Sequence, residues 1–370
     1  MQGDQSQAIL ACQNGLNFCN KKGKTSSQWR LYFLLCKAEC QLQEDPNAAL
    51  ETLTAIYANP VTASKVESAL IALGCATVSL HIGNLEEADK FLTCCANAIE
   101  EAGSCDNDVI SLKQLSGFYF LTYAIIAQTV GRMTQLQEGS EYPIFVRLQE
   151  SLHDELANQD LWLPSPAASA LGHLLHCSVL RSHGKGSAAA IHLGQAEEII
   201  DQGFEHCKVC WTKSENEYSM PTLFESKTYL QLKAVALEQQ ALSALMSVDL
   251  SGAAGHCLDL ISSLQRFPSI LRSRSPSVCI VFGHYMFAVN EFGLASDLFA
   301  SVLDISNAKH LHRLAALALC LSIIQMGDDG KAKHTLQGLQ HLNLNEPLEL
   351  HGLRSHERYG RNYLKVFSGL

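Results

Sequence analysis

Small side chains recur at fixed distances after turn residues, and this spacing limits the folds open to the chain. Each copy has an alanine five positions after the turn residue, then small or apolar residues nine and twelve positions after it. The turn residues are Gly83, Gly184, Asn290 and Gly327, with weaker copies at Glu44 and Asp249. An alanine at that position lets two antiparallel helices pack closely. Runs rich in Ala, Leu, Glu and Gln dominate, so we predict paired helices throughout.

The period of the copies indicates the type of helical repeat. Asn290 follows Asp249 by 41 residues and precedes Gly327 by 37. This period predicts an all-α fold, a right-handed solenoid (superhelix) of about seven hairpins of the tetratricopeptide (TPR) kind. We expect residues 1–370 to form a single TPR-like superhelical domain, with an irregular hairpin at about 105–160 and a loop at about 205–222. A non-repetitive helical bundle is the alternative.

Charge and hydropathy exclude two classes of partner. The formal net charge is −10, and a protein that grips nucleic acid by itself usually carries a basic stripe. The best basic run, between Arg354 and Lys365, is simpler to interpret as a solvated helix end, so we expect no direct nucleic acid binding. The longest apolar stretches, around 118–130 and 314–326, have about 13 residues and are too short to span a bilayer, so we expect no membrane segment.

Cysteine usage indicates the compartment. The chain has 14 cysteines, many of them inside helical patterns, where a free thiol behaves as a small hydrophobic group. Its first residues lack the basic start and apolar core of a secretory signal. Both features favour a reducing compartment, the cytosol or the nucleus.

No sequence motif points to catalysis. Cys207 and Cys210 form one CxxC pair, but a structural zinc site normally needs two such pairs, and a redox pair needs a βαβ context. We interpret them as reduced loop thiols. His173 and His176 share a helix with Cys177 and are expected at a helix-packing surface. The sequence therefore predicts no catalytic residue, no metal site and no cofactor.

The first helix of each hairpin in a TPR solenoid lines the inner, concave face. Counting back from the turns, the inward positions are mostly apolar, which predicts a groove that holds an extended, partly apolar segment of a partner protein. The alternative is a tight superhelix in which these side chains pack on one another. The candidate groove residues are Leu34, Gln41, Leu73, Thr77, Leu80, Leu174, Ser178, Arg181, Ile280, His284, Phe287 and Leu321.

Three stretches resemble a known family. They are Leu73-Gly74 with GNLEEADKFL at 83–92, Trp162-Leu163-Pro164 with the helix that follows, and FGHYMFAVNEFGLASDLFASVLDISN at 282–307. Their small and apolar residues are spaced as in the Mau family, the TPR subunit of the cohesin loading complex, and the resemblance extends over roughly residues 30–340.

That resemblance implies a non-enzymatic scaffold, nuclear and chromatin-associated, with the cytoplasm as a further location. Its groove would hold the extended N-terminal segment of the large Nipped-B-type loader subunit. The protein would then support cohesin loading and sister chromatid cohesion, with cohesin and chromatin contacted only indirectly. Two alternatives stay open: another TPR adaptor, such as a ubiquitin-ligase scaffold or co-chaperone, and an enzyme on a helical fold that uses Cys207 and Cys210.

Overall fold

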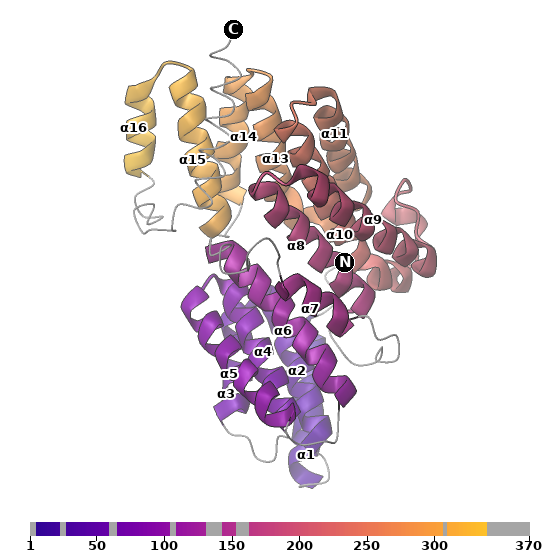
Figure 1. Cartoon of the computed structure of the whole chain (residues 1–370). Helices are drawn as coiled ribbons and strands as arrows, with labels where there is room; N and C mark the ends of the chain where they lie inside the picture. Colours follow the sequence, from indigo (N-terminus) through magenta and orange to yellow (C-terminus); the bar gives the residue numbers. More distant parts are fainter. Residues whose placement is uncertain are drawn as a thin grey trace. The chain divides into compact units, whose positions relative to one another are not determined.

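The structure is a computed structural model that describes residues 5–22, 27–58, 65–103, 109–130, 143–152, 163–305 and 309–338. Within these ranges every regular element is helical (Figure 1). The chain packs as two compact units, which are described separately: Met1–Ile126 with Val146–Ala157, and Ala127–Phe145 with Asn158–Leu370. The expectation of a single domain over residues 1–370 concerns how these units join and stays a prediction.

The first half of the chain contains seven described helices. They are α1 (Gln5–Lys22), α2 (Ser27–Glu44), α3 (Pro46–Ala58), α4 (Lys65–Ile82), α5 (Leu85–Gly103), α6 (Val109–Val130) and α7 (Pro143–Leu152). Of the irregular hairpin expected at about 105–160, the structure describes α6 and α7, and the rest lies outside the described residues.

The second half contains a longer series of paired helices. They are α8 (Ser165–Ser182), α9 (Gly186–Cys207), η3 (Glu215–Glu217), α10 (Met220–Met246), α11 (Leu250–Arg266), α12 (Pro268–Leu271), η4 (Arg272–Arg274), α13 (Ser275–Ala288), α14 (Phe292–Ile305), α15 (Lys309–Gln325) and α16 (Asp329–Gly338). The loop expected at about 205–222 corresponds to residues 208–219, between α9 and α10, and contains η3.

Five hairpins turn with the same backbone geometry. The turn residue has a left-handed backbone, with φ of 84° at Gly83, 75° at Gly184, 62° at Val248, 66° at Asn290 and 79° at Gly327. Its N–H donates to the carbonyl three residues earlier, and the next N–H donates to the carbonyl five residues before it. These paired bonds satisfy carbonyls that the end of a helix would otherwise leave open. The TPR-like turns are therefore repeats in backbone as well as in sequence.

The alanine after each turn is buried, as the spacing requires. Ala88 and Ala295 have no exposed surface, Ala189 is 2% exposed and Ala332 is 3% exposed. Each lies on the second helix of its hairpin, where a larger side chain would push the two helices apart. The fold is therefore the predicted all-α stack of TPR-like helical hairpins.

One weaker copy was assigned to the wrong register. The turn residue is Val248, not Asp249, and the buried alanine is Ala253 rather than the residue after it. Leu258, expected to be inside, is 62% exposed. A β-branched residue is disfavoured at positive φ, so the sequence pointed to its neighbour. Asp249 instead caps α11, because its carboxylate accepts a hydrogen bond from the N–H of Gly252 at 2.9 Å.

The hairpin of α2 and α3 turns in a different way. Between α2 and α3 the carboxylate of Asp45 accepts hydrogen bonds from the N–H groups of Asn47 and Ala48, each at 3.1 Å. The predicted turn residue, Glu44, thus directly precedes Asp45, whose side chain caps the start of α3. Ala49, five residues after Glu44, has no exposed surface.

A second small position lies on the first helix, seven residues before each turn. It is buried in every hairpin with a left-handed turn, and its occupants are Ala76, Cys177, Ala241, Gly283 and Cys320. At Gly283 a Cβ would lie 2.6 Å from the ring of Phe299 on α14, so only glycine fits there without movement. The two small positions together set the close approach of the paired helices.

The first helices of the second unit lie on one side of the stack (Figure 1). Neighbouring first helices touch directly: α8 meets α10, α10 meets α13, and α13 meets α15. The second helices α9, α11 and α14 pack instead against the first helix of the next hairpin. Since first helices are closer to one another than second helices are, they line the inner side of a curved stack.

Among the helices that the structure describes, one is long and apolar enough to cross a membrane by length and composition. This is α4, with 18 residues and a mean hydropathy of 1.3. Half of it is buried inside the first unit, where it packs against α3 and α5. The central helix of a packed core has the same composition, so this feature is accounted for by packing.

Candidate partner-binding surface

The candidate groove residues occupy three positions on the first helices: ten, six and three residues before the turn. At the first of these positions the side chains are largely inside the unit. Leu73 has no exposed surface, Leu174 is 2% exposed and Ile280 is 7% exposed. Ile280 packs with Val302 and Ala315, so it joins α13 to the hairpin that follows.

In the first unit the remaining candidates are half-buried. They are Leu34, Gln41, Thr77 and Leu80. The side-chain oxygen of Gln41 accepts a hydrogen bond from the Thr52 hydroxyl at 2.9 Å. The Thr77 hydroxyl donates to the carbonyl of Leu73 in its own helix, also at 2.9 Å.

In the second unit one candidate bridges two neighbouring first helices. Arg181 of α8 donates from Nη1 to the main-chain carbonyl of Gln239 on α10, at 3.2 Å. His284 packs edge-on against Phe299, with ring centroids 5.2 Å apart, and Ser178 is half-buried.

The last two candidates differ in exposure. Phe287 packs against Phe292 at 5.2 Å between ring centroids, whereas the side chain of Leu321 is 39% exposed. Most of the inner face is thus closely packed, and its use by a partner stays a prediction.

A buried ion pair on this surface escaped the sequence reasoning. Glu238 on α10 stands ten residues before its turn, where α4, α8 and α13 have Leu or Ile, and it is 6% exposed. Its Oε2 pairs with Nη2 of Arg274 in η4. Burial raises the pKa of the Glu238 carboxyl, and Arg274 opposes that shift. The only signal in the sequence was an acidic residue at an otherwise aliphatic position.

This pair leaves hydrogen-bonding capacity unused. Glu238 Oε1, Arg274 Nε and the side-chain oxygen of Gln239 are buried without a hydrogen-bond partner among the described residues. Such atoms usually contact internal water or destabilise the fold.

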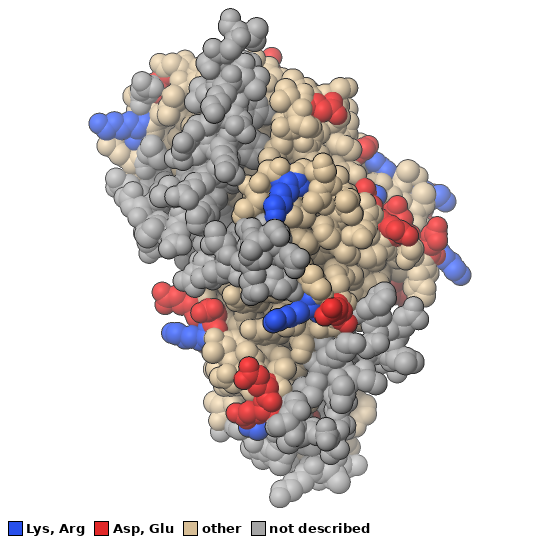
Figure 2. Space-filling model, in the orientation of Figure 1, with Lys and Arg blue, Asp and Glu red and all other residues tan. Residues whose placement is uncertain are grey.

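Other charges on the described surface are dispersed. On the face drawn in Figure 2, Lys and Arg side chains appear singly or beside Asp and Glu, within a largely uncharged surface. One set of ion pairs ties neighbouring hairpins together: Lys233 of α10 contacts Glu197 at 3.2 Å and Asp201 at 3.5 Å on α9. The basic run between Arg354 and Lys365 lies outside the described residues.

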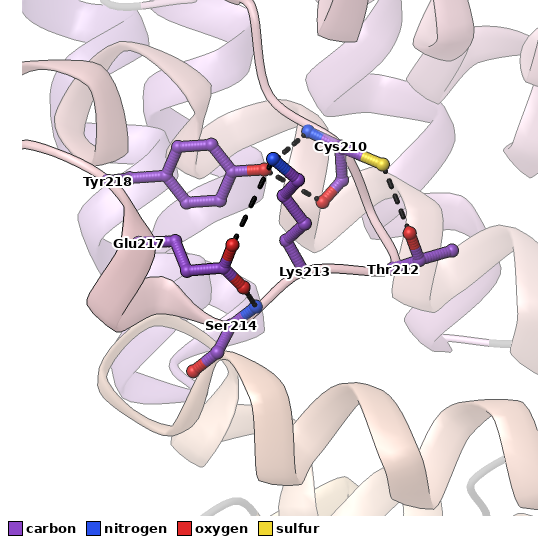
Figure 3. A network of polar contacts seen from close by, with 6 residues as sticks. All are labelled: Cys210, Thr212, Lys213, Ser214, Glu217 and Tyr218. Carbon is purple, nitrogen blue, oxygen red and sulfur yellow. Dashed lines mark hydrogen bonds and ion pairs between the residues drawn. The ribbon is translucent and has the colours of Figure 1, made fainter.

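Cys207 and Cys210 lie in different surroundings. Cys207 ends α9 and is buried, which raises the pKa of its thiol. Cys210 is exposed, and a hydrogen bond with the Thr212 hydroxyl, at 3.1 Å, lowers the pKa of its thiol (Figure 3). Among the described residues no three His, Cys, Asp or Glu side chains are placed to hold a metal ion.

The loop that carries Cys210 is held by the side chains of Tyr218 and Glu217. The Tyr218 hydroxyl accepts from the N–H of Cys210 at 2.8 Å and donates to its carbonyl at 3.1 Å. Glu217 accepts from the N–H of Ser214 at 3.0 Å and pairs with Lys213 at 3.9 Å (Figure 3). These contacts make the loop an ordered structural element, and they bring no general base to the thiol.

The histidines of α8 meet a third histidine from α9. Nδ1 of His173 lies 3.0 Å from Nδ1 of His192, and the rings of His176 and His192 are 4.0 Å apart. Burial, with the neighbouring rings, lowers the pKa of His173 to about 4 and of His176 to about 3. Phe145 of α7 stacks on His176 at 4.4 Å. Neutral imidazoles packed between helices fit the expected packing role.

Stacked hairpins whose first helices line one inner side define this protein as a helical-repeat protein of the TPR kind. The family of cohesin loading factors matches residues 1–357, so the chain belongs to that family. This confirms the family expected from the sequence.

One solved structure shows a distant similarity. A crystal structure of the APC/C hetero-tetramer Cut9–Hcn1 is similar at 13% sequence identity and a TM-score of 0.33. The similarity covers 92% of this chain, and this chain spans 58% of the length of that one. A likeness at this level says nothing about function. No curated protein matches the chain.

Proposed function

We propose that this protein is the non-enzymatic scaffold subunit of a cohesin loader. Its inner face would hold the extended N-terminal segment of the large Nipped-B-type subunit, and cohesin and chromatin would be contacted through that subunit. The main support is the family match over residues 1–357. The first helices support it further, because in the second unit they form a continuous inner surface. A protein with this role works in the nucleus.

The half-buried inner positions are the proposed contact points. In the second unit Arg181 and His284 combine an apolar body with a polar group, and in the first unit the half-buried Leu80 offers an aliphatic side chain. Such a surface suits an extended segment that offers both main-chain polar groups and apolar side chains. It does not resemble a cationic clamp for an acidic peptide terminus, which a co-chaperone would need.

Binding can be tested with the full chain and the N-terminal segment of the large subunit. Arg181→Glu should weaken binding at least tenfold, since a charge reversal in a desolvated contact opposes association. Lys333→Glu on the exposed side of α16 is the matched control and should leave the affinity within twofold. Equal affinities for the two variants would remove the inner face of the second unit from the proposed contact. Failure of the unchanged chain to bind the segment would refute the proposed partner.

A further inference from the structure

The loop between α9 and α10 contacts more than the two helices that it joins. Residues 208–219, here called the strap, contain the polar network of Figure 3. The second helices α9 and α11 each pack on α10, and much less on each other, whereas the first helices α8 and α10 touch directly. The second helices therefore diverge away from the inner side. A side chain that fills the space between their ends would set the angle between the two hairpins.

Trp211 of the strap fills this space. Its ring centroid is 6.0 Å from that of Phe204 on α9 and 5.8 Å from that of Phe267, which directly follows α11. Phe204 is 6% exposed and Phe267 has no exposed surface, so both partners are fixed in the core. The half-buried indole is thus a spacer between the end of α9 and the end of α11.

Two polar contacts fasten the strap to the end of α11 and the start of α12. Nη1 of Arg266 donates to the carbonyl of Trp211 at 2.8 Å, and its Nε donates to the carbonyl of Ser262 in its own helix at 3.2 Å. Glu215 Oε2 accepts from the N–H of Ser269 at 3.1 Å and from its hydroxyl at 2.7 Å. Arg266 is half-buried and Ser269 is exposed, so the second fastening lies at the surface.

Bonds within the strap connect the spacer to this outer fastening. The Tyr218 hydroxyl bonds both main-chain polar groups of Cys210, which closes a ring around residues 210–218 (Figure 3). The Glu217 side chain closes a smaller ring with the N–H of Ser214. Trp211 and Glu215 both lie inside the larger ring, so a displacement at one of them is passed to the other.

We propose that the strap is a latch that holds the hairpins α8–α9 and α10–α11 at a fixed angle. Trp211 is its spacer, and the contact of Glu215 with Ser269 is the fastening that opens first, because water competes for an exposed hydrogen bond. Negative charge at position 269 opens it, since like charge then faces the Glu215 carboxylate. The open latch leaves the inner face of α8 and α10 free to change its curvature. This inference does not depend on the proposed function.

Hydrogen exchange on the full chain tests the outer fastening. Ser269→Asp should speed exchange of the amides of residues 204–207, at the end of α9, at least fivefold, although Ser269 belongs to α12. Ser273→Asp makes the same substitution at an exposed position of η4 and is the matched control, which should leave these amides within twofold. Exchange at 204–207 that stays within twofold in Ser269→Asp, or that rises equally in both variants, overturns the proposal.

Two variants of Trp211 test the spacer. Trp211→Ala should speed exchange at least tenfold at the ends of both second helices, residues 204–207 and 263–266, because the space between them is emptied. Trp211→Phe keeps a ring there and should stay within threefold of the unchanged chain. The amides of α14 should keep their rates in every variant, which separates opening of the latch from general unfolding. A change in Trp211→Ala that is confined to one of the two helix ends would show that Trp211 does not space them.

Discussion

The close approach of paired helices predicts a sharp difference between two adjacent alanines in α9. Ala189 is 2% exposed at the contact with α8, whereas Ala190 is exposed on the outer side of the same turn. Replacing either residue by leucine changes helix propensity by the same small amount. Only Ala189→Leu adds three heavy atoms to a filled space. Overpacking of this kind costs about 1–3 kcal/mol of unfolding free energy.

Urea unfolding of the two variants, followed by circular dichroism, measures the difference. Because repeat proteins can unfold in parts, hydrogen exchange of α8 and α9 should accompany it. We expect Ala189→Leu to lower the unfolding free energy by about 1–3 kcal/mol and Ala190→Leu to change it by less than about 0.5 kcal/mol. Equal values for the two variants would refute the close-packed register on which the fold argument rests.

Three further predictions follow from other sites. Val248→Gly should raise the unfolding free energy by about 1 kcal/mol, because a β-branched residue at a φ of 62° is strained; a lower urea midpoint would contradict this. Between about pH 6.5 and 4, His173 and His176 bind protons in the unfolded chain but stay neutral in the folded protein. The unfolding free energy should therefore decrease by about 1–2 kcal/mol as the pH is lowered through this range, after allowance for their partial exposure. His176→Phe should flatten that slope in urea titrations across the range, and an unchanged slope would argue against neutral rings. Glu238→Leu should cost about 1–3 kcal/mol by leaving Arg274 unpaired, while Glu238→Leu with Arg274→Met should be near neutral; equal losses in the single and double variants would mean that the pair is not coupled.

Local chemistry explains why the repeat could be predicted. A left-handed turn favours Gly or Asn, and a close helix contact five residues later requires a small side chain, so both constraints fall within one short stretch. The turns at Gly83, Gly184, Asn290 and Gly327 are where the spacing placed them. The same logic failed at Val248 because this turn holds a β-branched residue at a φ of 62°, a conformation that its own side chain disfavours.

The amino-acid sequence by itself determined the helical hairpins, their turns and the family, since each depends on residues close together along the chain. Only the tertiary structure decided which side chains contact each other. Glu238 contacts Arg274, which lies 36 residues further along the chain, and His173 contacts His192 on the next helix. The residues next to Glu238 and His173 in the sequence do not indicate these partners. The burial of the inner-face candidates was likewise set by how near the successive first helices lie. That distance depends on many side chains packed together, which no local spacing encodes.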